Sequence, residues 1–160
     1  MKCYFLRHGA AAEPDTWQGS DFDRPLTPEG RKRITAEAEA LGELKLELDA
    51  IVTSPLLRAK QTAELVADAL KIRKRLREDE RAGVDFNSGS LGEIFRDQPD
   101  AEAVMVVGHE PSMSRTIGAV TGGARIDFKK GGLACVEFAD RSSLQGELLW
   151  LLPPKILLRT

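Results

Sequence analysis

The 160-residue chain has only two histidines, His8 and His109, and two cysteines, Cys3 and Cys135. It contains no run of about 18 apolar residues, which excludes a membrane-spanning helix and gives no reason to expect a membrane partner. The formal net charge of −2 argues against nucleic-acid binding driven by overall charge, although a local basic patch stays open. Arg7 interrupts the N-terminal apolar run too early for the core of a secretory signal peptide. We therefore expect a cytoplasmic protein with neither a membrane nor a nucleic acid as partner.

The two cysteines lie within strand-like apolar runs and lack the spacing of a metal site. We expect two buried free thiols rather than a disulfide, which agrees with a cytosolic compartment. Hydrophobic residues make up 42% of the chain and charged residues 30%, so the chain has the composition of an ordinary globular protein. It shows no repeat, low-complexity segment or linker, and residues 1–160 are predicted to form one domain.

Short apolar runs alternate with helical patterns, which is typical of an α/β fold built on a mostly parallel sheet. Thr27-Pro28 marks the start of the first helix, and Ser54-Pro55 repeats that signal before the second helix. The predicted strands are residues 2–7, 49–54, 72–76, 103–107, 133–139 and 147–153, and the predicted helices lie near residues 28–41, 55–69, 90–97 and 113–120. We expect a three-layer, doubly wound sheet with helices on both faces and one late strand antiparallel at the edge.

Reactive side chains follow three of the predicted strands. Arg7 and His8 end the first strand, Ser54 ends the second, and His109 comes just past the fourth. Arg58 lies one turn into the second helix, and helical side chains lean towards the helix N-terminus. Because the carboxyl ends of parallel strands meet at one edge of a sheet, we expect these side chains to converge there.

Two arginines, two histidines and a helix N-terminus suit a tetrahedral anion such as phosphate or sulfate. Guanidinium forks match phosphate oxygens, and the amides at a helix start provide further donors. A neutral imidazole can attack phosphorus and form a covalent phosphohistidine that water later hydrolyses. Nearby arginines favour the neutral form of His8, which is the form that attacks. Each of these residues alone would be interpreted as structural or solvated, but their joint placement favours a phosphoryl-transfer site.

Three motifs occur in register with the predicted strands: "FLRHG" after the first, "TSPLLRAKQTA" after the second and "VVGHE" after the fourth. Together they resemble the histidine phosphatase superfamily, which has the phosphoglycerate mutase-like fold. The stretch "DRPLTPEG" and the short chain look like the SixA-like branch of small bacterial phosphohistidine phosphatases. The resemblance covers essentially the whole chain.

The resemblance implies a role for each matching residue. His8 is expected to be the phosphorylated nucleophile, Arg7 and Arg58 to bind the phosphoryl group, and His109 to be the second histidine of the pocket. Arg24, in "DRPLT", matches a position that supplies another phosphate contact. The family implies neither a metal nor a nucleotide cofactor.

Many superfamily members carry an acid that protonates an alcohol leaving group, often on a long insertion after the third strand. Residues 77–103 are too few for such a lid subdomain. The candidate acids are Glu110, Asp79 and Glu80. The position of Glu110 at a helix start is also explained by the helix dipole, which favours a carboxylate there. Asp79 and Glu80 are expected to be solvated loop residues. When the N–P bond of a phosphohistidine breaks, the leaving group is an imidazole, which departs with little help from an acid. We therefore expect a phosphohistidine-bearing protein domain as the substrate and partner.

Several alternatives stay open from the sequence. Ser54 is an N-cap, a phosphate ligand or both, and in the loop 9–26 Trp17 and Phe22 either line the mouth of the pocket or pin the loop. "ARIDFKKGGLA" lacks the order of a nucleotide phosphate loop and is interpreted as strand, turn and strand. Two other functions compete with a phosphohistidine phosphatase: a small-molecule phosphomonoesterase with Glu110 or Glu80 as acid, and a non-catalytic phosphate-dependent binding module.

Overall fold

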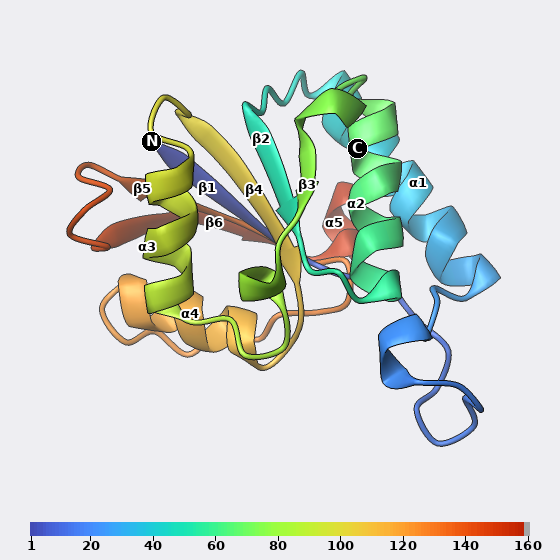
Figure 1. The fold of residues 1–160 in the computed structure, drawn as a ribbon. Coiled ribbons are helices and arrows are strands. Elements are labelled where there is room, and N and C mark those ends of the chain that lie inside the picture. The colour runs from blue at the N-terminus through green and yellow to red at the C-terminus, as the bar shows by residue number, and fades with distance from the viewer. Residues whose placement is uncertain (159–160) are drawn as a thin grey trace.

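The computed structural model describes residues 1–158, and in that range the strands form one mixed sheet (Figure 1). The strands are β1 (Lys2–Arg7), β2 (Ala50–Thr53), β3 (Leu76–Glu78), β4 (Ala103–Gly108), β5 (Leu133–Phe138) and β6 (Gly146–Leu152). Their order across the sheet is β3-β2-β4-β1-β5-β6. The first four strands in that order are parallel, and β5 runs antiparallel to both of its neighbours.

Helices cover both faces of the sheet, which confirms the predicted three-layer α/β architecture. The elements on one face are α1 (Pro28–Glu43), α2 (Leu57–Ala69) and α5 (Pro154–Leu157), and on the other α3 (Ser88–Asp97) and α4 (Ser112–Val120). Three short 3-10 helices complete the fold: η1 (Asp21–Asp23), η2 (Arg73–Arg75) and η3 (Glu80–Ala82). No helix among residues 1–158 is long and apolar enough to cross a bilayer.

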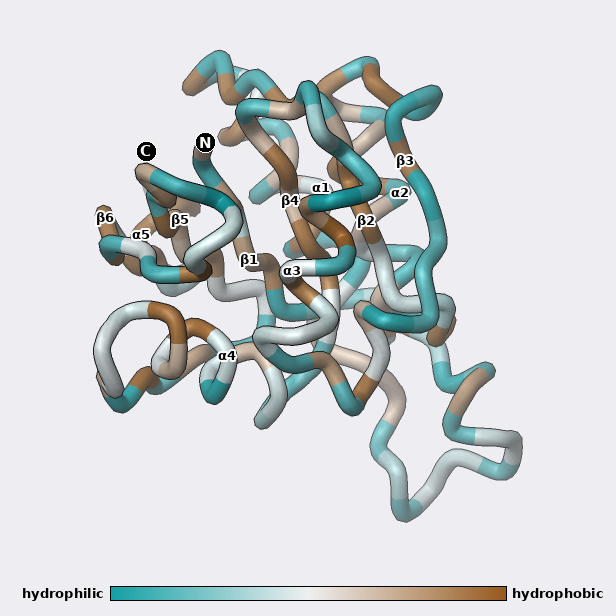
Figure 2. The backbone as a smooth tube through the Cα atoms, turned by 60° about the vertical axis from the view of Figure 1, so that its left-hand side comes forward, coloured by the Kyte–Doolittle hydropathy of each residue, from teal (hydrophilic) through white to brown (hydrophobic). Residues whose placement is uncertain are grey.

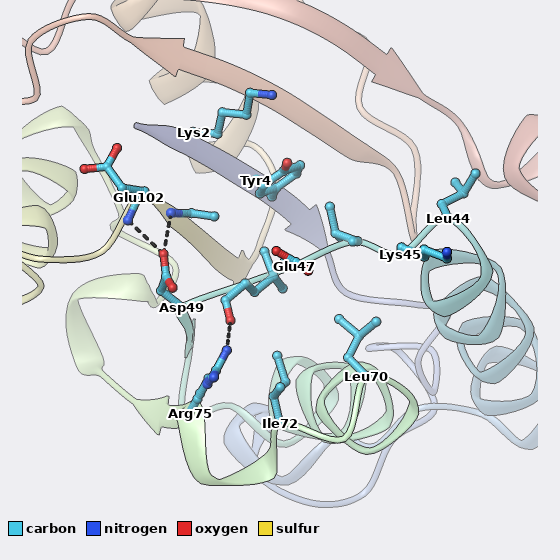
Figure 3. Close-up of a pocket in the computed structure, with 13 residues that line it drawn as sticks. Lys2, Tyr4, Leu44, Lys45, Glu47, Asp49, Leu70, Ile72, Arg75 and Glu102 are labelled. Carbon is cyan, nitrogen blue, oxygen red and sulfur yellow. Dashed lines mark hydrogen bonds between the residues drawn. The ribbon is translucent and has the colours of Figure 1, made fainter.

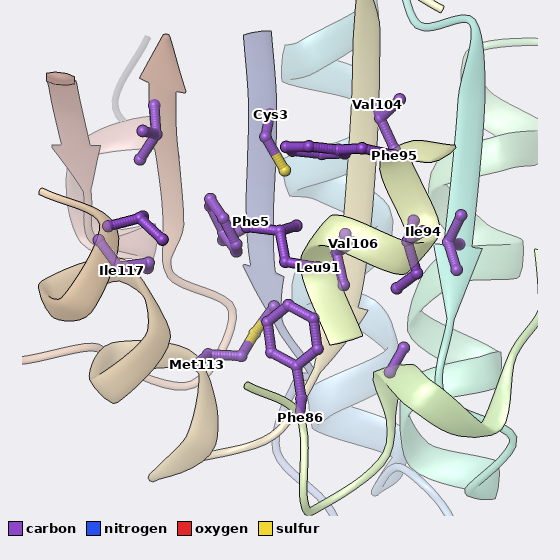
Figure 4. Close-up of a cluster of buried hydrophobic side chains, with 14 of the residues drawn as sticks. Cys3, Phe5, Phe86, Leu91, Ile94, Phe95, Val104, Val106, Met113 and Ile117 are labelled. Atoms are coloured by element: carbon purple, nitrogen blue, oxygen red, sulfur yellow. The ribbon is translucent and has the colours of Figure 1, made fainter. Parts of the chain in front are cut away.

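The side chains of β1 alternate between two apolar cores. Cys3 and Phe5 pack under α3 and α4, whereas Tyr4 and Leu6 pack under α1 and α2. Burial on both faces explains why the central strands are apolar without interruption (Figure 2). Figure 4 shows the first core, where Phe5 lies among side chains of α3 and α4 and near the ring of Phe86 in the loop before α3. Cys3 and Cys135 are both free and buried, as predicted.

The second helix begins later than predicted, so Ser54 is not its N-cap. The helix starts at Leu57, and the preceding Leu56 gives it no side-chain cap. The Ser54 hydroxyl oxygen instead accepts a hydrogen bond from the Leu56 N–H (3.2 Å) and lies 2.7 Å from the Nε2 atom of His109. Because Ser54 is engaged in this tight turn, Pro55 lies in a bend before the helix, and Arg58 is its second residue.

The third strand lies at Leu76–Glu78 rather than at 72–76. Residues 73–75 form η2 instead, because two arginines hold that segment to its surroundings. Arg73 pairs with Asp68 (2.8 Å), and Arg75 donates a hydrogen bond to the carbonyl of Leu48 (2.7 Å). The pairing with β2 therefore begins only at Leu76.

The last part of the sheet also differs from the prediction. The antiparallel strand is β5, which lies between β1 and β6, whereas the edge strand β6 runs in the same direction as β1. The segment "ARIDF" forms no strand, since the loop is tied to the end of β1. The Gly131 N–H lies 3.1 Å from the Arg7 carbonyl oxygen and 3.2 Å from that of His8.

A buried carboxyl group on α1, that of Glu37, is expected to make the stability of the fold depend on pH. Glu37 is only 4% exposed and packs against Gly131, where an added Cβ would lie 2.8 Å from its Oε1 atom. Burial raises the pKa of Glu37 to about 8, which the charge of Arg33 only partly opposes. In the folded protein Glu37 therefore keeps its proton at pH values where it ionises in the unfolded chain.

We expect Glu37→Gln to stabilise the protein increasingly as the pH rises. The stabilising protonated state is fully present below the unfolded pKa of Glu37 and is lost as the pH rises through the folded pKa. Relative to wild type, the variant should thus gain up to about 5 kcal/mol between pH 4 and pH 9. Urea unfolding of both proteins at several pH values measures the difference, and parallel stability profiles would contradict the prediction.

Candidate active site

The predicted site residues meet at the carboxyl edge of three neighbouring strands. His8 follows β1, His109 follows β4, and Ser54 follows β2. Backbone hydrogen bonds continue past the strand ends, from His8 N–H to the Gly108 carbonyl (3.1 Å) and from Ser54 N–H to the Val107 carbonyl (3.0 Å). The sheet ladder therefore fixes the three backbones relative to one another.

His8 is held as a neutral imidazole with one nitrogen available. Its Nδ1 atom lies 2.7 Å from the Gly9 carbonyl oxygen, and since a carbonyl can only accept, Nδ1 carries the proton and Nε2 keeps its lone pair. The residue is only 7% exposed. Burial lowers the pKa of His8 to about 3 against the opposing effect of the Gly9 carbonyl, and the charges of His109, Arg58 and Arg7 lower it further. The sequence argument rested on the arginines, but burial is the larger cause.

His109 lies beside His8, with the ring centroids 5.2 Å apart. Its Nε2 atom is bonded to the Ser54 hydroxyl, and its Nδ1 atom is buried without a partner. Burial, followed by the positive charge of Arg58, lowers the pKa of His109 to about 4. Both imidazoles are therefore neutral at physiological pH.

Arg7 and Arg58 are each anchored through terminal nitrogens. Arg7 donates from Nη1 to the Phe128 carbonyl (2.8 Å). Arg58 donates from Nη1 to the Asp21 carbonyl (2.9 Å) and from Nη2 to the Asp21 carboxylate (3.2 Å). In both arginines the Nε–H is buried and has no partner.

Three buried side-chain polar atoms lack a hydrogen-bond partner in residues 1–158, and all belong to this site. They are Nε of Arg7, Nε of Arg58 and Nδ1 of His109. Leaving a buried polar group unpaired costs about 1–3 kcal/mol, so most proteins avoid it. The two Nε–H groups are donors for an anion with several oxygens, as phosphate has, and Nδ1 of His109 is a third donor in the tautomer in which Nε2 accepts from the Ser54 hydroxyl.

The loop before α1 brings two further charged residues to the site. Arg24 donates from Nε to the Asp21 carboxylate (3.0 Å) and from Nη1 to the Ala12 carbonyl (2.7 Å). The Asp21 carboxylate thus bridges Arg24 and Arg58. A phosphate contact by Arg24 stays a prediction. In the same loop the Trp17 indole donates to the Ser20 carbonyl (2.9 Å), whereas Phe22 is 49% exposed.

The candidate acids lie in different surroundings. Glu110 is close enough for its charge to raise the pKa of Arg7 against the lowering by burial, and it accepts a hydrogen bond from the Ser114 N–H (2.8 Å) in the first turn of α4. Its role as proton donor stays a prediction. Asp79 accepts from the Arg81 N–H (2.9 Å) and pairs with the Arg81 guanidinium, so it caps η3.

Sequence reasoning missed three supporting contacts. They come from the Asp21 carboxylate, the Phe128 carbonyl and the Thr62 hydroxyl, which accepts from the Gly9 N–H (3.2 Å) and donates to the Arg58 carbonyl (2.8 Å). The i,i+3 spacing of Asp21 and Arg24 was an available signal. A backbone carbonyl such as that of Phe128 leaves no signal in the sequence.

The chain also has a large cavity at the opposite edge of the sheet, with a volume of about 850 Å³ (Figure 3). Lys2, Tyr4 and Asp49 are among its lining residues, and neither histidine is. Asp49 is used by the fold, since its Oδ2 accepts from the N–H groups of Glu102 (2.8 Å) and Ala103 (3.0 Å). The reactive groups instead gather at the carboxyl edge, where ligands of parallel α/β sheets bind.

Comparison with known proteins agrees with this geometry. Residues 3–85 match the sequence profile of the Histidine phosphatase superfamily (branch 1). The chain belongs to this superfamily. It is 35% identical over 171 residues to an uncharacterized protein of Picosynechococcus sp., with 99% of each chain covered. It is also 39% identical over 72 residues to phosphohistidine phosphatase SixA of Escherichia coli K12, over 45% of this chain and 43% of SixA.

Solved structures extend the similarity to nearly the whole of this chain. The protein histidine phosphatase SixA complexed with tungstate matches with a TM-score of 0.87 and 26% identity, covering 98% of this chain and 99% of that one. A putative SixA from Agrobacterium tumefaciens matches with a TM-score of 0.79 over 96% and 98% of the two chains. Its 24% identity shows a shared fold alone.

Proposed function

We propose that this histidine phosphatase removes the phosphoryl group from a phosphohistidine displayed on a protein domain, through a covalent intermediate on His8. The observation that carries the proposal is the group of three unpartnered polar atoms on Arg7, Arg58 and His109, beside a neutral imidazole with a free Nε2. The name of the relative SixA as a phosphohistidine phosphatase supports the substrate class, and a structure of SixA holds tungstate, a tetrahedral oxyanion.

The first step is an in-line displacement at phosphorus. The lone pair on Nε2 of His8 forms the new N–P bond, and the N–P bond of the substrate breaks with its electron pair returning to the leaving nitrogen. A substrate imidazole that is protonated on its other nitrogen leaves as neutral imidazole, so this step needs no protein acid. The guanidinium groups of Arg7 and Arg58 stabilise the oxygens of the transferring group.

The second step is hydrolysis of the phosphorylated His8. Water attacks phosphorus, the N–P bond breaks, and both protons of the water stay on the released phosphate. His8 leaves as neutral imidazole, since its Nδ1 proton is already held by the Gly9 carbonyl. The hydrogen bond that presents Nε2 for attack therefore also prepares His8 to leave.

We predict a preference for phosphohistidine over phosphate esters. An ester needs a proton for its alkoxide or phenoxide leaving group, and Glu110, the first-choice donor, is hydrogen-bonded to the Ser114 N–H. The test compares kcat/KM for a phosphohistidine-bearing protein domain and an aryl phosphate ester, with a chelator present. Comparable or better ester hydrolysis would move the function to small molecules, with Glu110 or Glu80 as donor. Phosphate binding without turnover would indicate a binding module.

A further inference from the structure

Asp21, in the loop before α1, bridges Arg24 and Arg58. One of its carboxylate oxygens accepts from Nε of Arg24 (3.0 Å), and the other accepts from Nη2 of Arg58 (3.2 Å). Its backbone carbonyl accepts from Nη1 of Arg58 as well (2.9 Å). Although η1 lies in a loop that projects from the body of the protein, this residue ties that loop to the reactive edge (Figure 1).

The contacts of Arg58 follow the same plan as those of Arg7. In each case a terminal nitrogen is held by an acceptor of the protein, and the buried Nε–H is left without a partner. For Arg7 the anchor is the Phe128 carbonyl, in a loop whose Gly131 and Gly132 are hydrogen-bonded to the backbone at the end of β1. For Arg58 the anchor is Asp21, so the direction of its Nε–H depends on an exposed loop residue.

We propose that Asp21 is a positioning residue, which holds Arg24 and Arg58 as a pair so that both guanidinium groups meet the phosphoryl group. The proposal rests on the phosphoryl-transfer site proposed above and adds to it the requirement for an acidic residue that does not touch the reacting atoms. A phosphoryl group then binds to donors that are already oriented, which lowers the entropic cost of reaching the transition state.

The charges around Asp21 explain why the pair needs an anchor. Burial lowers the pKa of Arg58 and the charge of Arg24 lowers it further, while Asp21 opposes both effects. Partial desolvation raises the pKa of Asp21, but its hydrogen bonds and the charges of Arg24 and Arg58 outweigh that effect, and the net pKa is lowered. Without the carboxylate, the guanidinium groups of Arg24 and Arg58 would repel one another beside Arg7, held only by the backbone carbonyls of Ala12 and Asp21.

A competing interpretation makes the opposite prediction. If Asp21 only occupied the arginines in place of substrate, then removing its negative charge would strengthen phosphate binding and raise turnover, since two anions would no longer compete. If it positions them, removing it weakens both phosphate binding and turnover despite the loss of a repelling charge. The sign of the change therefore decides between the two interpretations.

The experiment uses Asp21→Asn with Asp23→Asn as the matched control. Asp23 lies in the same 3-10 helix, is exposed, and has no side-chain hydrogen bond or ion pair within the described part of the chain. We expect Asp21→Asn to weaken the binding of inorganic phosphate, measured by calorimetry, and to lower kcat, each by about 10-fold or more. The Nε–H signal of Arg58 in NMR spectra should shift, whereas Asp23→Asn should leave all three readouts within about twofold of wild type.

The outcomes test the positioning role of Asp21 and the proposed function separately. Tighter phosphate binding or faster turnover in Asp21→Asn overturns the positioning role, and so does a result that matches Asp23→Asn. If the wild type binds phosphate without turnover, the proposed function fails while the binding ratio still decides the role of Asp21. If the wild type binds no phosphate, both fail. Thermal unfolding of each variant checks that the fold is retained.

Discussion

Replacing His8 with alanine is expected to abolish the phosphoenzyme and to lower kcat/KM by at least about 10³-fold. The variant loses the Nε2 lone pair that attacks phosphorus, and His109, with its ring centroid 5.2 Å away, cannot take its place without displacing Ser54 from Nε2. The measurement is the amount of acid-labile, alkali-stable phosphate bound to the protein after it is mixed with a ³²P-labelled phosphohistidine domain. The same sample gives the rate of phosphate release.

Phosphate binding supplies the control for His8→Ala. The anion donors on Arg7 and Arg58 are untouched by the substitution, so the variant should still bind inorganic phosphate within several-fold of wild type. Loss of both binding and turnover would point to a disrupted site rather than a missing nucleophile. A variant that kept the phosphoenzyme and wild-type turnover would show that the assignment of His8 is wrong.

The parts of the fold that the sequence predicts well are those where local pattern and tertiary environment agree. The uninterrupted apolar runs of β1 and β4 require a cover on both faces, and α3 with α4 on one side and α1 with α2 on the other supply it. Thr27 caps α1 as its sequence suggests, since its hydroxyl accepts from the Gly30 N–H (2.9 Å).

Prediction failed where a tertiary contact overrode a local signal. Ser54-Pro55 has the sequence of a helix start, but the Ser54 hydroxyl is bonded to His109, and the helix begins at Leu57, two residues later than predicted. The residues after the Gly122-Gly123 turn read as a strand, but hydrogen bonds from Gly131 to the end of β1 hold them as a loop. Both departures involve groups of the site, where conflicts between local and tertiary preference are expected.

The candidate site was predictable for a different reason. Arg7, His8 and His109 could be placed together because strand order and the common edge of a parallel sheet constrain them. The support for Arg58 could not be, because Asp21 reaches it across 37 positions of sequence from an irregular loop. The burial that lowers the pKa values of both histidines likewise depends on packing that no spacing of residues reveals.

Replacing Arg58 with alanine is expected to lower kcat/KM by about 10³-fold, because the transferring oxygens lose a donor that is already buried and oriented. Arg58→Lys should recover little of this loss, since an ammonium group cannot reproduce the guanidinium fork that meets both Asp21 and the phosphoryl group. The protein should stay folded. Burying the Arg58 cation carries a desolvation cost, which is the largest cause that lowers its pKa, and removing the cation relieves that cost while the packing of its stem is lost.

The matched control for Arg58→Ala is Lys60→Ala, which removes a cation from the same helix at a position that pairs with Glu78 on the surface. That variant should keep kcat/KM within about twofold of wild type, as most surface substitutions do. The measurement is kcat/KM with the phosphohistidine domain, together with calorimetric binding of inorganic phosphate and thermal unfolding of each variant. If Arg58→Ala kept both its activity and its phosphate affinity, then the unpaired Nε–H of Arg58 would not belong to the anion site. The remaining groups around His8, on Arg7, Arg24 and His109, would then be sufficient to hold the phosphoryl oxygens.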